Sequence, residues 1–299
     1  MRVFVTGATG FIGSEVVNEL IGAGHQVLGL TRSDAGAASL RAVGAQVHRG
    51  ELQDLASLRS GAANSDAVIH LAFIHDFSKF QENCEIDRRA IETLGAVLAG
   101  SDRPLIVTSG TGITGPTPGR LATEDDPPYT GPGAVPRAAS ELAAASIAER
   151  GVRVSLVRLP QVHDPEKQGL VTYAIALARE KGVSAFVGDG VNRWPAVHRS
   201  GAARLYRLVL EKGTSGARYH AVDEEGVAFR AIAEAIGRRV NVPVVSKSAE
   251  EAMKHFGWLG AFATMDLPAS SERTRKVLGW QPKGLGLIED IDARRSAAA

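Results

Sequence analysis

A glycine-rich loop near the amino end restricts the fold of this chain more than any other sequence feature. The loop reads Thr6-Gly7-Ala8-Thr9-Gly10-Phe11-Ile12-Gly13, and it joins an apolar segment, residues 2–5, to a segment with helical spacing of apolar residues, 16–21. Glycines let the backbone approach an anion closely, and the free N–H groups at the start of a helix point at it. We therefore predict a pyrophosphate-binding loop, with Gly7 at the turn, Gly10 at the close approach and Gly13 at the helix-to-strand contact.

Apolar and amphipathic segments alternate along the first half of the chain. Further strands are predicted at 26–30, 46–48, 67–71, 105–108 and 152–158, and helices at 35–43, 55–60, 83–98 and 137–150. This alternation predicts an α/β fold, a Rossmann doubly wound parallel sheet, with the cofactor at the carboxyl ends of the strands.

The alternation loosens after Pro160. Helices are predicted at 170–181, 201–211, 229–236 and 271–278, with short strands at 184–187 and 218–221. We expect residues 1–160 to form the dinucleotide-binding domain and residues 161–299 a smaller α/β substrate-binding cap, partly interleaved with the first domain. The stretch between Gly110 and Pro136 is rich in glycine, proline and threonine, which predicts a long loop at the active-site edge.

The bulk composition favours a small-molecule partner. The formal net charge of 299 residues is +1, with no basic block, so neither nucleic acid nor a membrane surface is an expected partner. The single cysteine, Cys84, cannot form an internal disulfide, and there is no long apolar run, which together favour a cytoplasmic protein. The eight histidines show no metal-ligand spacing, so no metal is expected.

Motifs along nearly the whole chain resemble the extended short-chain dehydrogenase/reductases, an epimerase/dehydratase-like group that binds NAD. The loop matches the TGxxGxxG pattern of that family, and the segments 70–72, 156–160, 188–198 and 278–282 resemble later family motifs in the same order. The resemblance implies a cofactor-binding protein with the fold predicted above. It also implies a homodimer in which the helices at 83–98 and 137–150 pair with those of a second copy.

The catalytic residues of the family do not match. Members carry a serine after the fifth strand and a later Tyr-x-x-x-Lys, in which the tyrosine acts as acid or base. Here Gly110 occupies the serine position, and Val135 and Ala139 occupy the tyrosine and lysine positions. If the alignment is shifted so that Arg137 is the substitute, a positive charge is recovered, but no phenol takes the place of the tyrosine. The chain therefore resembles the atypical members that keep the cofactor loop and lose the triad.

The end of the second predicted strand favours NADP over NAD. It reads Leu30-Thr31-Arg32-Ser33, with no carboxylate to repel a 2′-phosphate, and Arg32 is able to pair with that phosphate while Ser33 adds a donor. Glu51 and Leu52 are expected at the adenine. The remaining expected cofactor contacts are Gly7, Thr9, Gly10, Phe11, Ile12, Gly13, Leu71, Ala72, Phe73, Thr108 and Pro160.

Three residues are candidates for the chemistry. Ser109 and Thr111 carry hydroxyls that would stabilise a developing alkoxide, and His163 carries an imidazole that would donate a proton. The alternative for both hydroxyls is a bond to the backbone of a glycine-rich turn, and for His163 a bond to Asp164 or to backbone. Substrate contacts are expected from His75, Arg137, Gln161 and Trp194.

These observations leave three hypotheses open. The first is NADPH-dependent reduction of a small or medium carbonyl compound. The second is a nucleotide-sugar epimerase or dehydratase, and the third is a non-catalytic protein that senses redox state through bound NADP.

Overall fold

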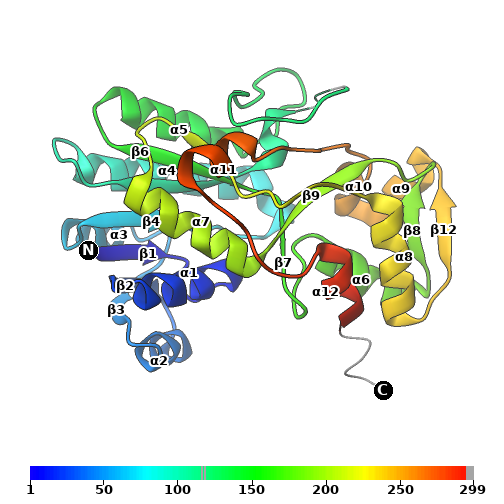
Figure 1. Cartoon of the computed structure of the whole chain (residues 1–299), viewed down its shortest axis with the longest axis horizontal. Helices are drawn as coiled ribbons and strands as arrows, with labels where there is room; N and C mark the ends of the chain where they lie inside the picture. Colours follow the sequence, from blue (N-terminus) through cyan, green and yellow to red (C-terminus); the bar gives the residue numbers. More distant parts are fainter. Residues whose placement is uncertain (116, 118, 294–299) are drawn as a thin grey trace.

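The structure, a computed structural model, describes residues 1–115, 117 and 119–293, and it is built around a parallel sheet with helices on both faces (Figure 1). The sheet has seven strands in the order β10-β6-β5-β4-β1-β2-β3, and every neighbouring pair is parallel. The strands are β1 (Arg2–Thr6), β2 (Gln26–Thr31), β3 (Gln46–Arg49), β4 (Ala67–His70), β5 (Leu105–Gly110), β6 (Val154–Leu159) and β10 (Arg218–His220). The predicted doubly wound α/β fold is confirmed.

The chain reverses its direction across the sheet at β1. From β1 it proceeds outward to β2 and β3, and then it returns to the other side of β1 for β4, β5 and β6. Because ligands bind where the strand order reverses, the loop that follows β1 lies at the place where a cofactor is expected.

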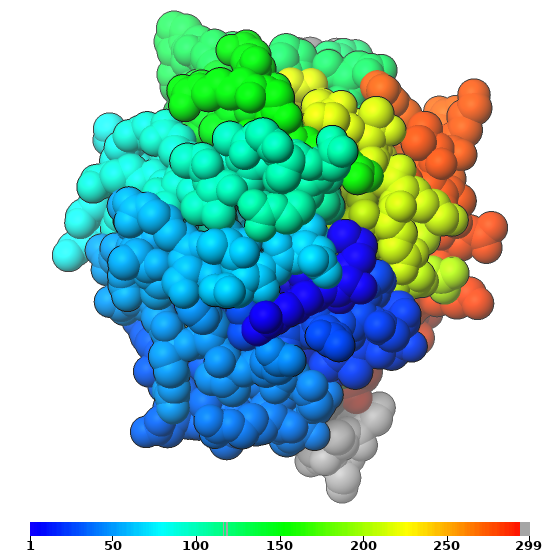
Figure 2. All heavy atoms as spheres, turned by 90° about the vertical axis from the view of Figure 1, so that its left-hand side faces the viewer, coloured from blue at the N-terminus to red at the C-terminus, as the bar shows by residue number. Residues whose placement is uncertain are grey.

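Two helical layers cover the two faces of the sheet, and each layer encloses an apolar core against it. The helices are α1 (Phe11–Gly22), α2 (Asp34–Ala42), α3 (Leu55–Ala63), α4 (Phe80–Leu98), α5 (Ala138–Glu149), α7 (Arg199–Lys212) and α11 (Glu272–Leu278). One core packs α1 and α7 against the sheet, and the other packs α3, α4 and α5 against its opposite face. Figure 2 shows one side of the molecule, on which the blue N-terminal residues lie beside the yellow-green residues of α7.

The C-terminal part builds a third core around two small sheets. The first sheet has the order β11-β9-β7, and the second pairs β12 with β8. The strands are β7 (Gln161–His163), β8 (Ser184–Val187), β9 (Arg193–His198), β11 (Glu224–Ala228) and β12 (Val244–Lys247). The helices are α6 (Val171–Lys181), α8 (Phe229–Val240), α9 (Ala249–Phe256), α10 (Gly260–Ala263) and α12 (Leu287–Ala293).

Residues beyond 160 contribute to both parts of the molecule. Strand β10 pairs with β6 at the edge of the large sheet, with Arg218 opposite Leu156, and α7 packs on α1. The chain therefore crosses between the two parts several times after the predicted boundary. Residues 294–299 of the expected cap lie outside the described residues.

The long segment after β5 is anchored at its middle. Glu124 is buried and accepts hydrogen bonds from the backbone N–H (2.8 Å) and the hydroxyl (2.6 Å) of Thr274, while Ala122 forms a bridge with Ala269. Tyr129 is 39% exposed and donates its hydroxyl to the carbonyl of Pro132, so its phenol points away from the cavity described next.

Candidate functional site

A cavity of 1120 Å³ lies along the carboxyl ends of β2, β1, β4, β5 and β6 and extends under the C-terminal part. At the sheet it is lined by Gly7, Thr9, Gly10, Phe11, Ile12, Gly13, Arg32, Ser33, Glu51, Leu52, Leu71, Ala72, Phe73, Thr108, Ser109, Thr111, Val135, Arg137 and Pro160. Every cofactor contact expected from the sequence is in this lining.

The glycine loop has the backbone geometry that an anion site requires. Gly7 has a φ of 68°, and a Cβ there would lie 2.8 Å from the Ala72 nitrogen. A Cβ on Gly13 would lie only 2.0 Å from the Gly7 oxygen. Gly10 is the N-cap of α1 and provides no side-chain cap, so the first N–H groups of the helix are available to a ligand.

The outer end of the cavity combines one cation with a helix start. Arg32 is exposed, and Ser33 caps α2 by accepting a hydrogen bond from the Gly36 nitrogen (3.0 Å), which leaves the Ser33 hydroxyl proton available for donation. The next residue, Asp34, is already engaged by the Arg49 guanidinium. The arrangement suits an anion between Arg32 and Ser33.

Thr108 lines the cavity, but its hydroxyl is used internally. It donates to the carbonyl of His70 (2.7 Å) and lies 2.7 Å from the hydroxyl of the buried Tyr206. Thr108 therefore shapes the cavity but offers no free hydroxyl to a ligand.

Two residues with hydroxyls, one near the end of β5 and one directly after it, line the cavity. Ser109 and Thr111 are 4% and 5% exposed, and within the described part of the chain no hydrogen-bond partner satisfies the Ser109 Oγ. A buried hydroxyl without a partner loses free energy, so this group is suited to a ligand. A Cβ added to Gly110, between the two, would meet only the Leu159 oxygen at 3.7 Å.

A buried polar network connects the glycine loop to Arg137. The Thr6 hydroxyl oxygen accepts from the Leu71 and Ala72 nitrogens (3.1 Å each) and lies 2.8 Å from His70 Nδ1. Because that oxygen already accepts two bonds, its own proton goes to Nδ1, and His70 Nε2–H then donates to Asp87 (3.1 Å). The histidine is thus held as one neutral tautomer.

Asp87 is the centre of this network. The Arg137 guanidinium lies 2.8 Å from its carboxylate, and the Ser140 hydroxyl donates to it at 2.6 Å. Burial opposes the charge, but Arg137 and the hydrogen bonds from His70 and Ser140 outweigh it and hold the pKa of Asp87 below its usual value. Arg137 also donates to the Thr108 carbonyl (3.0 Å) and lies 3.9 Å above the Phe73 ring.

The residue four positions after Arg137 is an acid, but its carboxylate is used elsewhere. That residue is Glu141, whose carboxylate binds the Arg158 guanidinium in a bidentate pair at 2.7 and 2.8 Å. Both side chains are buried. The pair ties α5 to β6 and does not line the cavity.

The structure does not bring His163 to the cavity, which corrects the catalytic expectation. His163 is the last residue of β7 and is fully buried, and its Nδ1 lies 2.6 Å from Asp290 of α12 rather than against Asp164. Burial and the neighbouring His198 lower the pKa of His163 to about 4, so it is neutral at pH 7. Its position indicates that it fastens α12 to the sheet.

The other expected substrate residues line the cavity in different ways. His75 packs edge-on against Phe73, and burial and the charge of Arg137 lower its pKa. Gln161 uses its Oε1 to accept from the Leu170 nitrogen (2.9 Å). Trp194 is 1% exposed and packs on Phe229. It is therefore a fixed part of the cavity lining, not a side chain that moves to meet a substrate.

Sequence reasoning missed Lys167 and most of the apolar wall. Lys167 lines the cavity with its Nζ 5.5 Å from the centre of the Phe11 ring, which places a cation beside the glycine loop. No motif in the sequence points to it. The missed apolar lining comprises Ile74, Phe77, Phe80, Leu170, Tyr173, Phe262, Met265 and Leu267.

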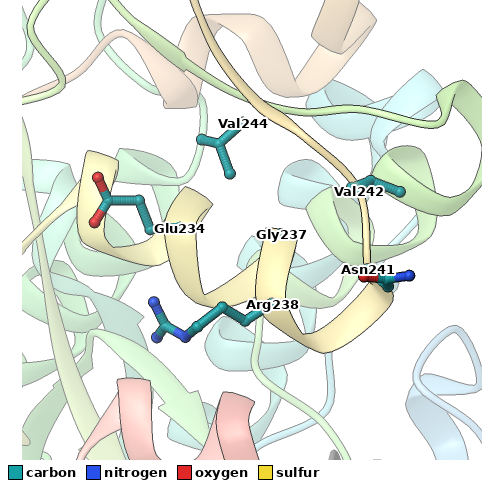
Figure 3. A pocket seen from close by; sticks show the side chains of 6 residues that line it. All are labelled: Glu234, Gly237, Arg238, Asn241, Val242 and Val244. Carbon is teal, nitrogen blue, oxygen red and sulfur yellow. The ribbon is translucent and has the colours of Figure 1, made fainter.

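A second hollow of 420 Å³ lies at the end of α8, and Figure 3 shows the six residues around it. Its charged groups already have partners, since Arg238 pairs with Asp292 (2.8 Å) and Glu234 with Arg230 (2.9 Å). It shares no lining residue with the larger cavity.

Comparisons with known proteins agree with this geometry. The model of the NAD dependent epimerase/dehydratase family matches residues 3–223. An uncharacterized protein of Schizosaccharomyces pombe is 49% identical over 292 residues, which cover 97% of this chain and 98% of that protein. A decarboxylating sterol-4-alpha-carboxylate 3-dehydrogenase of Dictyostelium discoideum is 28% identical over 248 residues, which cover 77% of this chain and 73% of that protein.

Solved structures share the fold at lower identity. The dTDP-glucose 4,6-dehydratase DesIV of Streptomyces venezuelae, solved with NAD bound, aligns with a TM-score of 0.76 and 22% identity. The alignment covers 99% of this chain and 97% of that one. Among the helices that the structure describes, none is long and apolar enough to cross a membrane.

Proposed function

Because the chain belongs to the NAD-dependent epimerase/dehydratase family, we propose that it is an oxidoreductase that uses NADPH to reduce the carbonyl group of a small or medium-sized compound. The observation that carries this proposal is the cavity itself. It runs from Arg32, past the glycine loop, to the unpartnered Ser109 hydroxyl and an apolar chamber beyond. A dinucleotide and a substrate are thereby accommodated in one connected space.

The residues present fit a dinucleotide. The first turn of α1 and the close packing of Gly13 on Gly7 form a cradle that a single Cβ would fill, and such a cradle is suited to a pyrophosphate. Lys167 adds a positive charge on the same side. When bound there, the cofactor supplies hydride to a carbonyl carbon.

Arg32 and Ser33 favour the 2′-phosphate of NADP. A guanidinium forms bidentate, charge-assisted bonds with a phosphate, and the carboxylate two residues after Arg32, that of Asp34, is already paired with Arg49. We expect Arg32→Gln to raise the Kd for NADPH by about 10- to 100-fold, because a hydrogen bond to a charged group contributes about 1.5–3 kcal/mol.

Fluorescence titration of NADPH and NADH checks this prediction, and Arg41→Gln, at the other end of α2, is the matched control. The affinity for NADH is expected to stay unchanged in both variants. An equal loss of affinity for NADPH and NADH in Arg32→Gln would show that Arg32 does not bind the 2′-phosphate.

Ser109 and Thr111 are proposed to stabilise the oxygen on which negative charge develops. Each hydroxyl donates a hydrogen bond, and burial of the site strengthens that bond. In a reduction by a hydride that the bound cofactor would supply, Ser109 and Thr111 would hold the carbonyl oxygen as the C=O π pair moves onto it, and water would supply the proton of the alcohol. Arg137, held by Asp87, lines the same space and fixes its shape there.

We expect Ser109→Ala to lower kcat/KM by about 100-fold, the effect of losing one donor to a developing oxyanion. The Kd for NADPH should not change, because the hydroxyl is proposed to act on the substrate. Steady-state kinetics with a panel of ketones and aldehydes, together with the exposed control Ser39→Ala, measures this. Unchanged kinetics in Ser109→Ala would remove the hydroxyl from the proposed chemistry.

An epimerase or dehydratase is the second candidate, supported by the family match and by the likeness to DesIV. Those reactions return the cofactor to its starting state, whereas the proposed reduction consumes NADPH. Net loss of NADPH absorbance during turnover therefore separates the two. Tight NADPH binding with no turnover of any carbonyl or nucleotide sugar would favour the redox sensor, which the residues Gly110, Val135 and Ala139 at the triad positions also support.

A further inference from the structure

The chamber beyond Ser109 is walled by aromatic rings from three separate segments. We call Phe77, Phe80, Tyr173, Trp258 and Phe262 the aromatic wall. Phe77 and Phe80 follow β4, Tyr173 comes from α6, and Trp258 and Phe262 come from the segment around α10. All but Trp258 line the cavity.

Phe77 is the centre of the aromatic wall. It stacks on Trp258 with 4.3 Å between ring centres and 9° between planes. Its ring also meets Tyr173 at 6.2 Å and Phe262 at 6.2 Å, both edge to face. Residues far apart in the sequence thus pack their rings in stacked and edge-to-face pairs. These are the geometries that aromatic rings prefer.

Arg137 lies above Phe73 (3.9 Å), which contacts Phe80 of the aromatic wall (6.1 Å between ring centres), so one charged group is close to the wall. The other charged groups are at the far end of the cavity or by the glycine loop. Arg32 and Glu51 lie at the opposite end, by the carboxyl ends of β2 and β3. The Arg137 charge is compensated by Asp87, and Lys167 is near the Phe11 ring of the glycine loop. Met265 and Leu267 complete the chamber beside the rings. A phosphate placed among these rings would lose its hydration, and the guanidinium beside them already serves Asp87.

We propose that the aromatic wall is the subsite for a planar, uncharged apolar group of the substrate, so that the natural substrate is an aryl or fused-ring carbonyl compound without phosphate. This inference rests on the proposed function, since it names the substrate class of the same site. The ring of the substrate would pack on Tyr173 and Phe262 while its carbonyl lies by Ser109.

The test measures binding separately from turnover. The wild-type protein is saturated with NADP⁺, which cannot reduce a ketone, and is titrated calorimetrically with 2-acetylnaphthalene, dihydroxyacetone and UDP-glucose. We expect 2-acetylnaphthalene to bind at least about tenfold more tightly than either polar compound. Absence of its binding, or tighter binding of UDP-glucose or dihydroxyacetone, would overturn the inference.

Variants then locate the bound ring. Tyr173→Leu and Phe262→Leu should each weaken 2-acetylnaphthalene binding by about tenfold, with NADP⁺ binding unchanged. Tyr173 is 41% exposed, so its replacement is not expected to unfold the protein, and Leu142→Ala on the exposed face of α5 is the control. Unchanged affinity in both wall variants would place the ligand elsewhere.

The two proposals fail differently. If 2-acetylnaphthalene binds at the wall but NADPH never reduces it, the subsite stands and the reduction is wrong. If NADPH reduces dihydroxyacetone while 2-acetylnaphthalene does not bind, the reduction stands and the substrate class is wrong.

Discussion

Gly13→Ala is expected to abolish NADPH binding, raising the Kd by at least about 100-fold. The new Cβ would lie 2.0 Å from the Gly7 oxygen and 2.8 Å from its carbonyl carbon, so the loop and the start of α1 must separate. The N–H groups would then no longer converge on the pyrophosphate. The loss of one or two charge-assisted hydrogen bonds, about 1.5–3 kcal/mol each, accounts for this change in affinity.

The matched control lies in the same helix. Gly22 is exposed at the end of α1, and a Cβ there meets nothing within 4 Å, so Gly22→Ala should bind NADPH like the wild type. Fluorescence titration gives both constants, and circular dichroism shows that the variants are folded. Wild-type affinity in a folded Gly13→Ala protein would mean that the loop does not hold the cofactor.

The first half of the fold was predictable because each element has a strong local pattern. Apart from β3, which reads Gln-Val-His-Arg and is partly exposed, strands β1 to β6 are largely buried apolar runs, and the helices between them carry apolar residues at helical spacing. Boundaries differ by a few residues, as at α4, which begins at Phe80 rather than Asn83. Local spacing decides the element, but the start of α4 follows a 3-10 turn, Phe77–Lys79, and has no side-chain cap that the sequence would reveal.

The C-terminal part was harder because its strands are short and pair far along the chain. β7 has three residues, and β11 reads Glu-Glu-Gly-Val-Ala, which lacks alternation. α12, also unpredicted, is a short helix fastened by Asp290 to His163. These elements form because tertiary packing supports them, and no local sequence pattern predicts such packing.

The site divides in the same way. The glycine loop and Arg32 were predictable, because a contiguous motif and a strand end place them. The partners of Arg137 and His163 were not, since Asp87 and Asp290 are distant in sequence and nothing local pairs them. Sequence reasoning placed Arg137 at the cavity correctly, but it did not show that a buried carboxylate holds the guanidinium.

Asp87→Asn is expected to destabilise the protein by about 3–5 kcal/mol, because it leaves the charge of Arg137 without its buried partner. Asp87 is fully buried on α4 and joins three other side chains, those of His70, Arg137 and Ser140. Urea unfolding at pH 7 measures the loss. Glu92→Gln is the control on the same helix, since its pair with Arg88 is partly exposed and should contribute less than about 1 kcal/mol.

The pH dependence gives an independent check of the same pair. The pKa of Asp87 in the folded protein is held below its unfolded value, which is about 3.9, so its ionisation stabilises the fold above that pH and the contribution is lost as the pH falls through the folded pKa. The free energies of unfolding of wild type and Asp87→Asn should therefore differ by a constant amount between about pH 5 and pH 7 and converge below about pH 4.

The difference in the free energy of unfolding should be insensitive to salt, because a buried pair is poorly screened, whereas the Glu92 pair weakens as salt is added. A Glu92→Gln loss as large as that of Asp87→Asn, or a wild-type advantage that persists undiminished well below the folded pKa, would show that Asp87 does not hold Arg137 through its charge.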